Sequence, residues 1–330
     1  MTATSSPSSP HLGAVVAGKY RLREVLGRGG MGAVFEAERI VDGALFALKR
    51  IDEAFARDSV ACARFAREAQ AASAAASDHI VRVFDSGVDE GCPFLVMERL
   101  RGEDLGARLR RTHHLADYEA VDVGRQVLLG LERAHAAGVV HRDLKPDNVF
   151  LGGAGSARPV VKIVDFGMSK MHAFGRTMPL SLTVRGVAVG TPLYMSPEQA
   201  AAKADVDERS DLYSVGAMLF ECVTGRPPHV GESNESILQA IRTTRAPSVR
   251  EIAPKTSRDV ADVIDRALSF EREDRFATAT AMRTALEACH VVVPRPRRGG
   301  TVALWIAGVL SLVFGVAAAV GIAWLVGGGP

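Results

Sequence analysis

Residues 141–148 read HRDLKPDN, and residues 165–167 read DFG. Together these motifs supply two acids and an amide, Asp143, Asp165 and Asn148. Transfer of a phosphoryl group from ATP needs such a set, because one acid accepts the proton of an attacking hydroxyl while the amide and the other acid offer oxygen ligands to Mg²⁺. Either motif alone would be weak, but both in this order and at this separation predict a phosphotransfer site.

Two apolar segments, residues 149–151 and 160–164, lie between these motifs. Their pattern predicts a pair of strands. Such a pair would bring Asp143 and Asp165 to one edge of a cleft.

A glycine-rich segment lies near the N-terminus, where Gly27, Gly29 and Gly32 match G-x-G-x-x-G. Alone this pattern is ambiguous, because dinucleotide-binding folds share it and many glycine clusters are turns. Residues 20–26 and 33–38 both alternate as strands do, whereas a dinucleotide-binding fold would begin a helix after the glycines. We therefore predict a glycine hairpin whose backbone amides approach the ATP phosphates, since no Cβ intervenes.

A third strand, residues 44–49, ends at Lys49. A lysine at a strand end is ordinarily a solvated edge residue. The helix that follows, however, places Glu68 on its apolar face, where an unpaired carboxylate would be costly to bury. We predict that Lys49 and Glu68 form a pair that holds the ATP phosphates; the alternative for Glu68 is an ordinary surface charge.

Residues 96–100 have the pattern of a strand that enters a connection between two lobes. The backbone groups of Glu98 and Leu100 are predicted to be free to pair with the edge of adenine. This prediction rests on position, since the side chains there carry little information.

A long amphipathic helix is predicted over residues 117–137, with His135 as a packed core histidine rather than a catalyst or metal ligand. Beyond Asp165 comes an irregular segment rich in hydroxyls, which is typical of a functional or mobile loop. A phosphate on this loop would need a cationic receptor, and Arg142 is the candidate. The alternative is that Arg142 pairs with a carboxylate.

The whole chain has 330 residues, a formal net charge of +2 and four scattered cysteines. This charge gives no support for a nucleic-acid partner. Cysteines without a CxxC pattern favour free thiols in a reducing compartment, and the histidines show no zinc-site spacing. Residues 1–19 are rich in Ser and Pro without an apolar run, so we expect a disordered leader and no signal peptide.

Residues 301–326 carry no charge. About 25 residues at ~1.5 Å each span roughly 37 Å, more than the ~30 Å hydrocarbon core of a bilayer. With Trp305 and Trp324 near its ends and a basic linker at 290–300, the run predicts one transmembrane helix with the preceding domain in the cytoplasm. The alternative is a long core helix. Only residues 327–330 follow, so the helix is either a tail anchor or part of a truncated relative of a longer protein.

Small residues recur every four positions along this predicted membrane helix, a spacing that lets two helices approach closely. They suggest a homodimer, although an alanine-rich composition alone explains the pattern equally well. The stripe consists of Ala303, Ala307, Ser311, Gly315, Ala319 and Ala323.

These motifs in their order resemble the eukaryotic-type (Hanks-type) protein serine/threonine kinases, in particular the bacterial membrane-anchored ones. The resemblance covers about residues 20–289 and implies an α+β, bilobal protein-kinase fold. It implies an N-terminal lobe over about 20–100, with an antiparallel β-sheet and one helix, and a mostly α-helical C-terminal lobe over about 101–289. The implied activity is ATP-dependent phosphorylation of serine and threonine hydroxyls of proteins, with Mg²⁺, or alternatively Mn²⁺, as the metal.

The resemblance also assigns roles to individual residues. Asp143 would be the catalytic base and Lys145 a contact to the γ-phosphate, while Lys49 would contact the α- and β-phosphates. Asn148 and Asp165 would be the metal ligands. The adenine would lie among Leu26, Val34, Ala47 and Phe150.

Further positions match parts of the family that hold the fold and the activation segment. Glu198 and Arg275 match an ion pair, and Asp211 matches an acid that braces the catalytic loop, residues 141–148. Thr183 lies at the spacing where relatives are autophosphorylated, and Ser181 is the second choice.

Two other functions are compatible with a kinase-like chain. A catalytically dead kinase fold could serve as a membrane-tethered scaffold, but such proteins generally lose the lysine, an aspartate or the glycines, all of which are present here. A small-molecule kinase would typically lack the Thr-Pro…Pro-Glu segment at residues 191–198.

Overall fold

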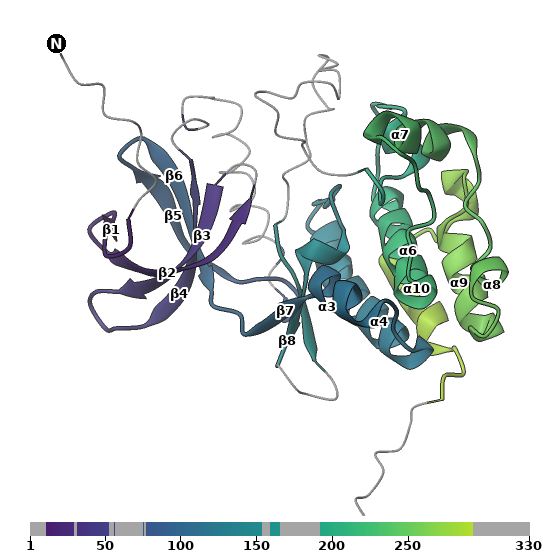
Figure 1. Ribbon diagram of the computed structural model, residues 1–330, viewed down its shortest axis with the longest axis horizontal. Helices are drawn as coiled ribbons and strands as arrows, with labels where there is room; N and C mark the ends of the chain where they lie inside the picture. Colours follow the sequence, from purple (N-terminus) through teal and green to yellow (C-terminus); the bar gives the residue numbers. More distant parts are fainter. Residues whose placement is uncertain are drawn as a thin grey trace, which may run out of the picture. The chain divides into compact units, whose positions relative to one another are not determined.

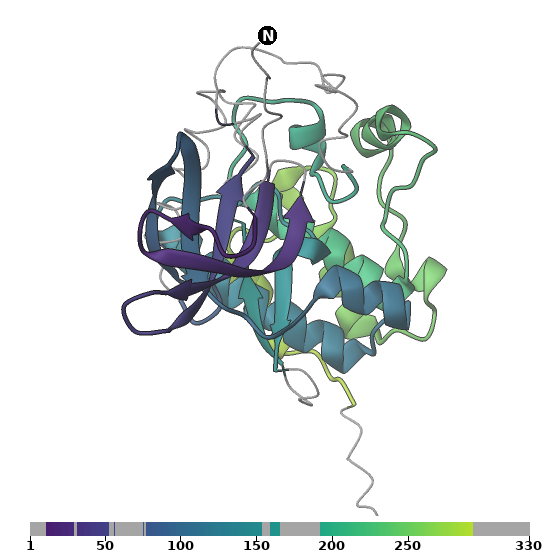
Figure 2. The same ribbon diagram turned by 60° about the vertical axis from the view of Figure 1, so that its left-hand side comes forward.

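The structure is a computed structural model of the chain, shown in Figures 1 and 2. It describes residues 11–29, 32–52, 56, 75, 77–153, 159–165 and 192–292.

The N-terminal lobe is built on an antiparallel sheet with the strand order β1-β2-β3-β4-β6-β5. In β3 the apolar residues alternate with polar ones, so Ala33, Phe35 and Ala37 are buried on one face. The strands of this sheet, on the left in Figure 1, are β1 (Val15–Val16), β2 (Tyr20–Gly29), β3 (Gly32–Arg39), β4 (Leu45–Ile51), β5 (Val83–Asp89) and β6 (Cys92–Glu98).

Strand β1 lies inside residues 1–19, for which the sequence predicts a disordered leader. That prediction is wrong for residues 11–19. Val16 pairs with Tyr20 and is 1% exposed. A strand this short gives no periodicity in the sequence, and its stability comes from the sheet that it joins. Residues 1–10 lie outside the described ranges.

A second, smaller sheet has the order β7-β8-β9. Its strands are β7 (Gly102–Asp104), β8 (Val149–Gly152) and β9 (Val160–Ile163). The antiparallel pairing of β8 with β9 confirms the predicted strand pair. The C-terminal end of β9 also contacts the segment before β5, because Ile163 donates a backbone hydrogen bond to His79 and accepts one from Val81, both at 2.9 Å.

The rest of the described C-terminal lobe is helical, on the right in Figure 1. The predicted helix over residues 117–137 is confirmed as α4 (Asp117–Ala136). The remaining helices are α3 (Leu105–Thr112), η1 (Pro146–Asn148), α5 (Pro197–Ala200), α6 (Arg209–Thr224), α7 (Asn234–Thr243), α8 (Val249–Ile252), α9 (Arg258–Ala267), η3 (Arg272–Asp274) and α10 (Ala279–Glu287).

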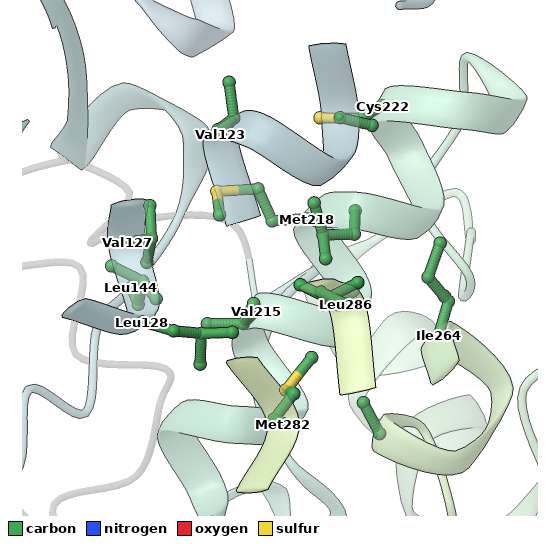
Figure 3. Packing of buried hydrophobic residues seen from close by; sticks show 14 of the residues in the cluster. Val123, Val127, Leu128, Leu144, Val215, Met218, Cys222, Ile264, Met282 and Leu286 are labelled. Carbon is green, nitrogen blue, oxygen red and sulfur yellow. The ribbon is translucent and has the colours of Figure 1, made fainter. Parts of the chain in front are cut away.

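Helix α6 is the centre of this lobe and is buried along almost its whole length. Such burial is possible because apolar residues occur all round the helix. Figure 3 shows how Val215 and Met218 of α6 lie among side chains of α4 and α10, such as Val127 and Leu286. The helix thus forms a rigid support, and the catalytic loop is attached to it.

Several predictions fall outside the described ranges. These are Glu68, the loop hydroxyls Ser181 and Thr183, the membrane helix at 301–326 with its stripe of small residues, and the tail at 327–330. Within residues 11–292, as far as they are described, no helix is long and apolar enough to span a bilayer.

Candidate active site

The catalytic loop is anchored on Asp211, a fully buried acid of α6. Its carboxylate accepts hydrogen bonds from the backbone nitrogens of His141 and Arg142, each at 2.8 Å. Burial alone would raise the pKa of Asp211, but the hydrogen bond and charge of His135, the charge of His141 and the Arg142 amide hold the pKa below its ordinary value. Arg142 has a φ of +65°, which non-glycine residues rarely adopt, so the two bonds to Asp211 hold a strained turn.

His135 also belongs to this anchor. The sequence predicts a packed core histidine, and the side chain is indeed only 11% exposed, but its Nε2 lies 2.9 Å from Oδ2 of Asp211. Sequence reasoning missed this partner. The only signal for it was the place of His135 near the end of α4, shortly before the catalytic loop.

Asp143 contacts Lys145 and Asn148, two of the residues predicted to act with it. Lys145 donates from Nζ to Oδ2 of Asp143 at 3.3 Å. Asn148 donates from Nδ2 to the backbone oxygen of Asp143 at 2.8 Å and approaches its Oδ2 at 3.5 Å. The short helix η1 turns the chain back so that these side chains can converge.

Asp165 reaches the same region from the end of β9. Its carboxylate forms an ion pair with Nζ of Lys49 at 2.8 Å, although the two residues are 116 positions apart. The peptide before it is fixed to the catalytic loop, because Val164 donates to the backbone oxygen of Asn148 at 2.9 Å. Strand β4 therefore delivers the lysine, and β9 delivers the acid, to one place.

Asn148 and Asp165 have the donor atoms that a hard divalent cation requires. The amide nitrogen of Asn148 is used by Asp143, which leaves its amide oxygen as the available ligand. In the described part of the chain, no three His, Cys, Asp or Glu side chains gather as a metal centre. A cation such as Mg²⁺ that keeps waters and binds substrate phosphates needs only one or two protein ligands, so the residues fit it.

The predicted pair of Lys49 with Glu68 stays a prediction, because Glu68 lies outside the described ranges. The ion pair of Lys49 with Asp165 was not predicted. No sequence pattern links a strand end to an acid so far along the chain, and only the fold brings them together.

Three of the residues predicted to contact adenine belong to one apolar cluster. Val34, Ala47 and Leu100 pack with Met97 and with Val164. Leu26 and Phe150 lie outside this cluster, and Leu26 is 44% exposed. The cluster joins the N-terminal sheet, the segment after β6 and the end of β9.

The predicted glycine hairpin is present between β2 and β3. Gly29 is paired with Gly32 in the antiparallel register, and Gly27 is paired with Val34. Gly32 has a φ of +159°, and a Cβ built on it would lie 2.1 Å from the backbone oxygen of Arg50. Close packing on β4 therefore requires a glycine at position 32.

The backbone of Glu98 is less available to pair with adenine than the sequence predicts. Its backbone nitrogen donates to the backbone oxygen of Arg82 at 2.9 Å. Its carboxylate accepts hydrogen bonds from the backbone nitrogen of Arg82 at 2.8 Å and from Nζ of Lys162 at 2.7 Å. The predicted free backbone amide of Glu98 is therefore wrong, and its carbonyl is the remaining candidate for adenine.

The alternative prediction for Arg142 is an ion pair with a carboxylate, but its side chain has a different partner. Its Nη2 donates to the backbone oxygen of Val206 at 3.2 Å, and among the described residues its buried Nε has no hydrogen-bond partner. Its role as a receptor for a phosphate stays a prediction. The backbone oxygen of Arg142 accepts from Gln199 of α5 at 2.8 Å, a contact that sequence reasoning missed.

Glu198 and Arg275 form the ion pair that the resemblance implies. The pair is bidentate, with distances of 2.7 and 2.8 Å, and the side chains are 5% and 0% exposed. Burial alone would raise the pKa of Glu198, but the hydrogen bonds and charge of Arg275 hold it below its ordinary value. Arg275 also donates to the backbone oxygens of Ser269, Phe270 and Arg209, so its remaining donors are used.

A small hollow lies beside the catalytic loop. Tyr194 is held there at two points, because its hydroxyl donates to Oε2 of Glu221 at 2.5 Å and its backbone oxygen accepts from Ser214 at 2.8 Å. The hollow is lined by Arg142, Asp143, Leu144, Lys145, Tyr194, Met195 and Ser214. Asp143 and Lys145 thus lie together in the lining of this hollow.

The two-lobed arrangement and this set of residues define the class of protein. Residues 20–286 match the family model described as the protein kinase domain, so the chain belongs to the protein kinase family. The sequence-based prediction of a eukaryotic-type serine/threonine kinase is confirmed by its relatives.

Two curated relatives illustrate the similarity. The serine/threonine-protein kinase Pkn1 of Myxococcus xanthus is 38% identical over 292 residues, which are 87% of this chain and 41% of Pkn1. The serine/threonine-protein kinase PknE of Mycobacterium tuberculosis is 36% identical over 280 residues, which are 85% of this chain and 48% of PknE. The chain thus spans about half the length of these relatives.

The fold is also similar to solved structures. The crystal structure of the PknI kinase domain of Mycobacterium tuberculosis matches with a TM-score of 0.65 and 26% identity. The match covers 85% of this chain and 99% of that domain.

Proposed function

We propose that this chain is an active protein serine/threonine kinase that transfers the γ-phosphate of ATP to hydroxyls of protein substrates. The observation that carries this proposal is the convergence of four polar residues from distant segments. Lys49 pairs with Asp165 at 2.8 Å, and Asn148 contacts Asp143 at 2.8 Å. A catalytically dead relative would be expected to lack one of them.

In this mechanism Asp143 accepts the proton of the substrate hydroxyl. The hydroxyl oxygen forms the new bond to the γ-phosphorus while the bond between that phosphorus and the ADP oxygen breaks. Lys145, 3.3 Å from the Asp143 carboxylate, is placed to offset the charge on the transferred phosphoryl group. Lys49 holds the nucleotide phosphates. Most of the rate enhancement would come from orientation, which can contribute roughly 7–11 kcal/mol.

We propose Mg²⁺ as the metal, with Mn²⁺ as an alternative, held by the amide oxygen of Asn148 and the carboxylate of Asp165. When bound, the cation neutralises phosphate charge. The protein's part is to fix these two ligands, and the backbone bond from Val164 to Asn148 at 2.9 Å ties them together.

The test is phosphate labelling of a general protein substrate, such as myelin basic protein, from radiolabelled ATP. Asp143→Ala and Lys49→Ala should each abolish labelling while circular dichroism and the unfolding temperature stay close to those of the unchanged protein. Asp262→Ala, which removes a 69% exposed carboxylate on α9, is the matched control and should retain activity. Full labelling by either active-site variant would contradict the role of that residue.

We also propose that activity depends on autophosphorylation at Thr183, or at Ser181 as the second choice. The support is their position in the hydroxyl-rich segment and the presence of Arg142 as a candidate phosphate receptor. Mass spectrometry after incubation with ATP tests the proposal. Absence of phosphate between Ser169 and Thr191 would contradict it.

Membrane attachment through residues 301–326 is a further proposal, supported by the absence of charge in that run and by Trp305 and Trp324. The expected location is the cytoplasmic membrane, with the kinase domain in the cytoplasm. Carbonate extraction of membranes from expressing cells should leave the chain in the membrane fraction. A homodimer through the small-residue stripe would lose its dimer signal in Gly315→Ile; an unchanged signal would exclude that interface.

A further inference from the structure

An ion pair ties the segment after β6 directly to the strand of the glycine hairpin. Nε of Arg99 lies 2.5 Å from Oε2 of Glu36 on β3. The two side chains are only 24% and 13% exposed, so water screens this pair less than an ordinary surface pair. Neither of these two atoms has a well-directed hydrogen-bond partner among the residues that the structure describes, so the contact is chiefly one of charge.

The pair lies at the rim of the apolar cluster that contains three of the residues predicted to contact adenine. Glu36 is opposite Ala47 in the register of β3 with β4. Strand alternation places Glu36 on the same face as Val34, and both Val34 and Ala47 belong to the cluster. On the other side, Arg99 immediately precedes Leu100, which is also part of the cluster.

The pair also links β3 directly to the segment after β6. Among the described residues, the backbone pairing between β3 and residue 99 runs through two successive ladders, β3 with β4 and β4 with β6, while the ion pair links them directly. The neighbouring Glu98 is tied the other way, to Lys162 of β9 at 2.7 Å. The adjacent side chains of Glu98 and Arg99 thus form ion pairs in opposite directions, Glu98 with β9 of the C-terminal lobe and Arg99 with β3 of the N-terminal sheet.

We propose that Arg99 and Glu36 are positioning residues for the nucleotide: their ion pair fixes the spacing between β3 and the connecting segment, and so pre-sets the adenine site. This inference rests on the proposed placement of ATP. A site held in its binding geometry before the ligand arrives loses less entropy on binding. The pair should therefore affect nucleotide affinity and leave the chemical step unchanged.

The experiment compares Arg99→Ala, Glu36→Ala and the charge-swapped double variant Glu36→Arg/Arg99→Glu in the 330-residue chain. Each single variant should raise the KM for ATP by about fivefold, the scale of a partly buried ion pair, with kcat changed by less than about twofold. ADP affinity, measured by calorimetry, should fall by a similar factor. The swapped variant should recover at least half of the lost ADP affinity in free-energy terms.

The matched control is Glu38→Ala. Glu38 lies two residues along the same strand, but its ion-pair partner is Arg23 of β2 and the pair does not reach the connection. This variant should leave ATP KM and ADP affinity unchanged. A similar loss in Glu38→Ala would overturn the inference, because any carboxylate on β3 would then have the same effect.

Two further outcomes separate this inference from the proposed function. Unchanged ADP affinity in Arg99→Ala, together with loss of labelling in Lys49→Ala, would overturn the ion-pair inference and leave the proposed active site intact. Full labelling in Lys49→Ala would overturn the proposed site and the inference with it. A lowered ADP affinity without recovery in the swapped variant would also overturn the inference, since the pairing itself would not be responsible.

Discussion

Buried polar side chains link α6 to neighbouring segments of the C-terminal lobe. Tyr213 of α6 illustrates the arrangement, because the guanidinium of Arg275 lies 5.0 Å from its ring centroid while its hydroxyl is 3.2 Å from Nε2 of His229. A buried charge is favourable only when its partner and its hydrogen bonds are present, so each of these residues depends on the next.

Removing one partner of the Glu198–Arg275 pair should therefore strongly destabilise the folded protein. Glu198→Gln or Arg275→Met leaves the other charge uncompensated in a site that is at most 5% exposed. We expect a loss of about 3–5 kcal/mol in the free energy of unfolding, measured by urea titration. The exposed pair Arg242–Glu235 is the control, and Arg242→Ala should change stability by less than about 0.5 kcal/mol. Equal effects at the two pairs would contradict the role of burial.

His229 should make stability depend on pH. It is 5% exposed, and burial lowers its pKa below the ordinary value of 6.5. Below about pH 6.5 the unfolded chain then binds a proton that the folded chain does not, so stability is present above this pH and is lost as the pH falls toward the folded pKa. The slope can reach about 1.4 kcal/mol per pH unit in that window.

The measurement is the free energy of unfolding at pH 7.5 and pH 5.5, for the unchanged protein and for His229→Gln. The decrease between the two pH values should be smaller in the variant, because glutamine does not titrate. An identical decrease would mean that His229 contributes nothing to the pH dependence.

At the scale of elements, the packing of α6 requires a small residue at one crossing. A Cβ built on Gly216 would lie 2.8 Å from Cβ of Ala267 on α9. At Gly124 of α4 the corresponding contacts are the methyl ends of Leu219 and Leu286, at 2.9 and 3.0 Å, which are flexible. The two glycines thus differ in what surrounds them, although both lie inside long helices.

We expect Gly216→Ala to destabilise the protein by about 1–3 kcal/mol, since overpacking outweighs the gain in helix propensity. Gly124→Ala should cost less than about 1 kcal/mol, because leucine ends can rotate away. Thermal unfolding of both variants checks this difference. A larger loss at Gly124 would contradict it.

The elements were predictable where a local pattern specified them, and the contacts of the site mostly were not. The period of residues 117–137 predicts α4, and the alternation on both sides of the glycines predicts β2 and β3. Strand β1 has too few residues to show a period. The pairs Lys49–Asp165 and Arg99–Glu36 join segments that only the tertiary fold brings together, so no spacing in the sequence indicates them.

At the scale of the whole molecule, the described residues form unequal cores. The larger apolar cluster joins α4, α6, α9 and α10, while a separate, smaller cluster lies within the N-terminal sheet. The cluster that contains Ala47 and Val164 connects the two lobes. Local opening has a lower free-energy cost where fewer apolar contacts must be broken.

Amide hydrogen exchange should therefore be faster in β2 and β3 than in α4 and α6. ADP with Mg²⁺ should slow exchange in β2 and β3 and leave α6 unchanged, because the nucleotide would add contacts to the sheet that it touches. Mass spectrometry of peptides from these four elements measures both effects. Equal protection of all four without nucleotide would show that the molecule opens as one unit, and slowing confined to α6 would place the ligand away from the glycine hairpin.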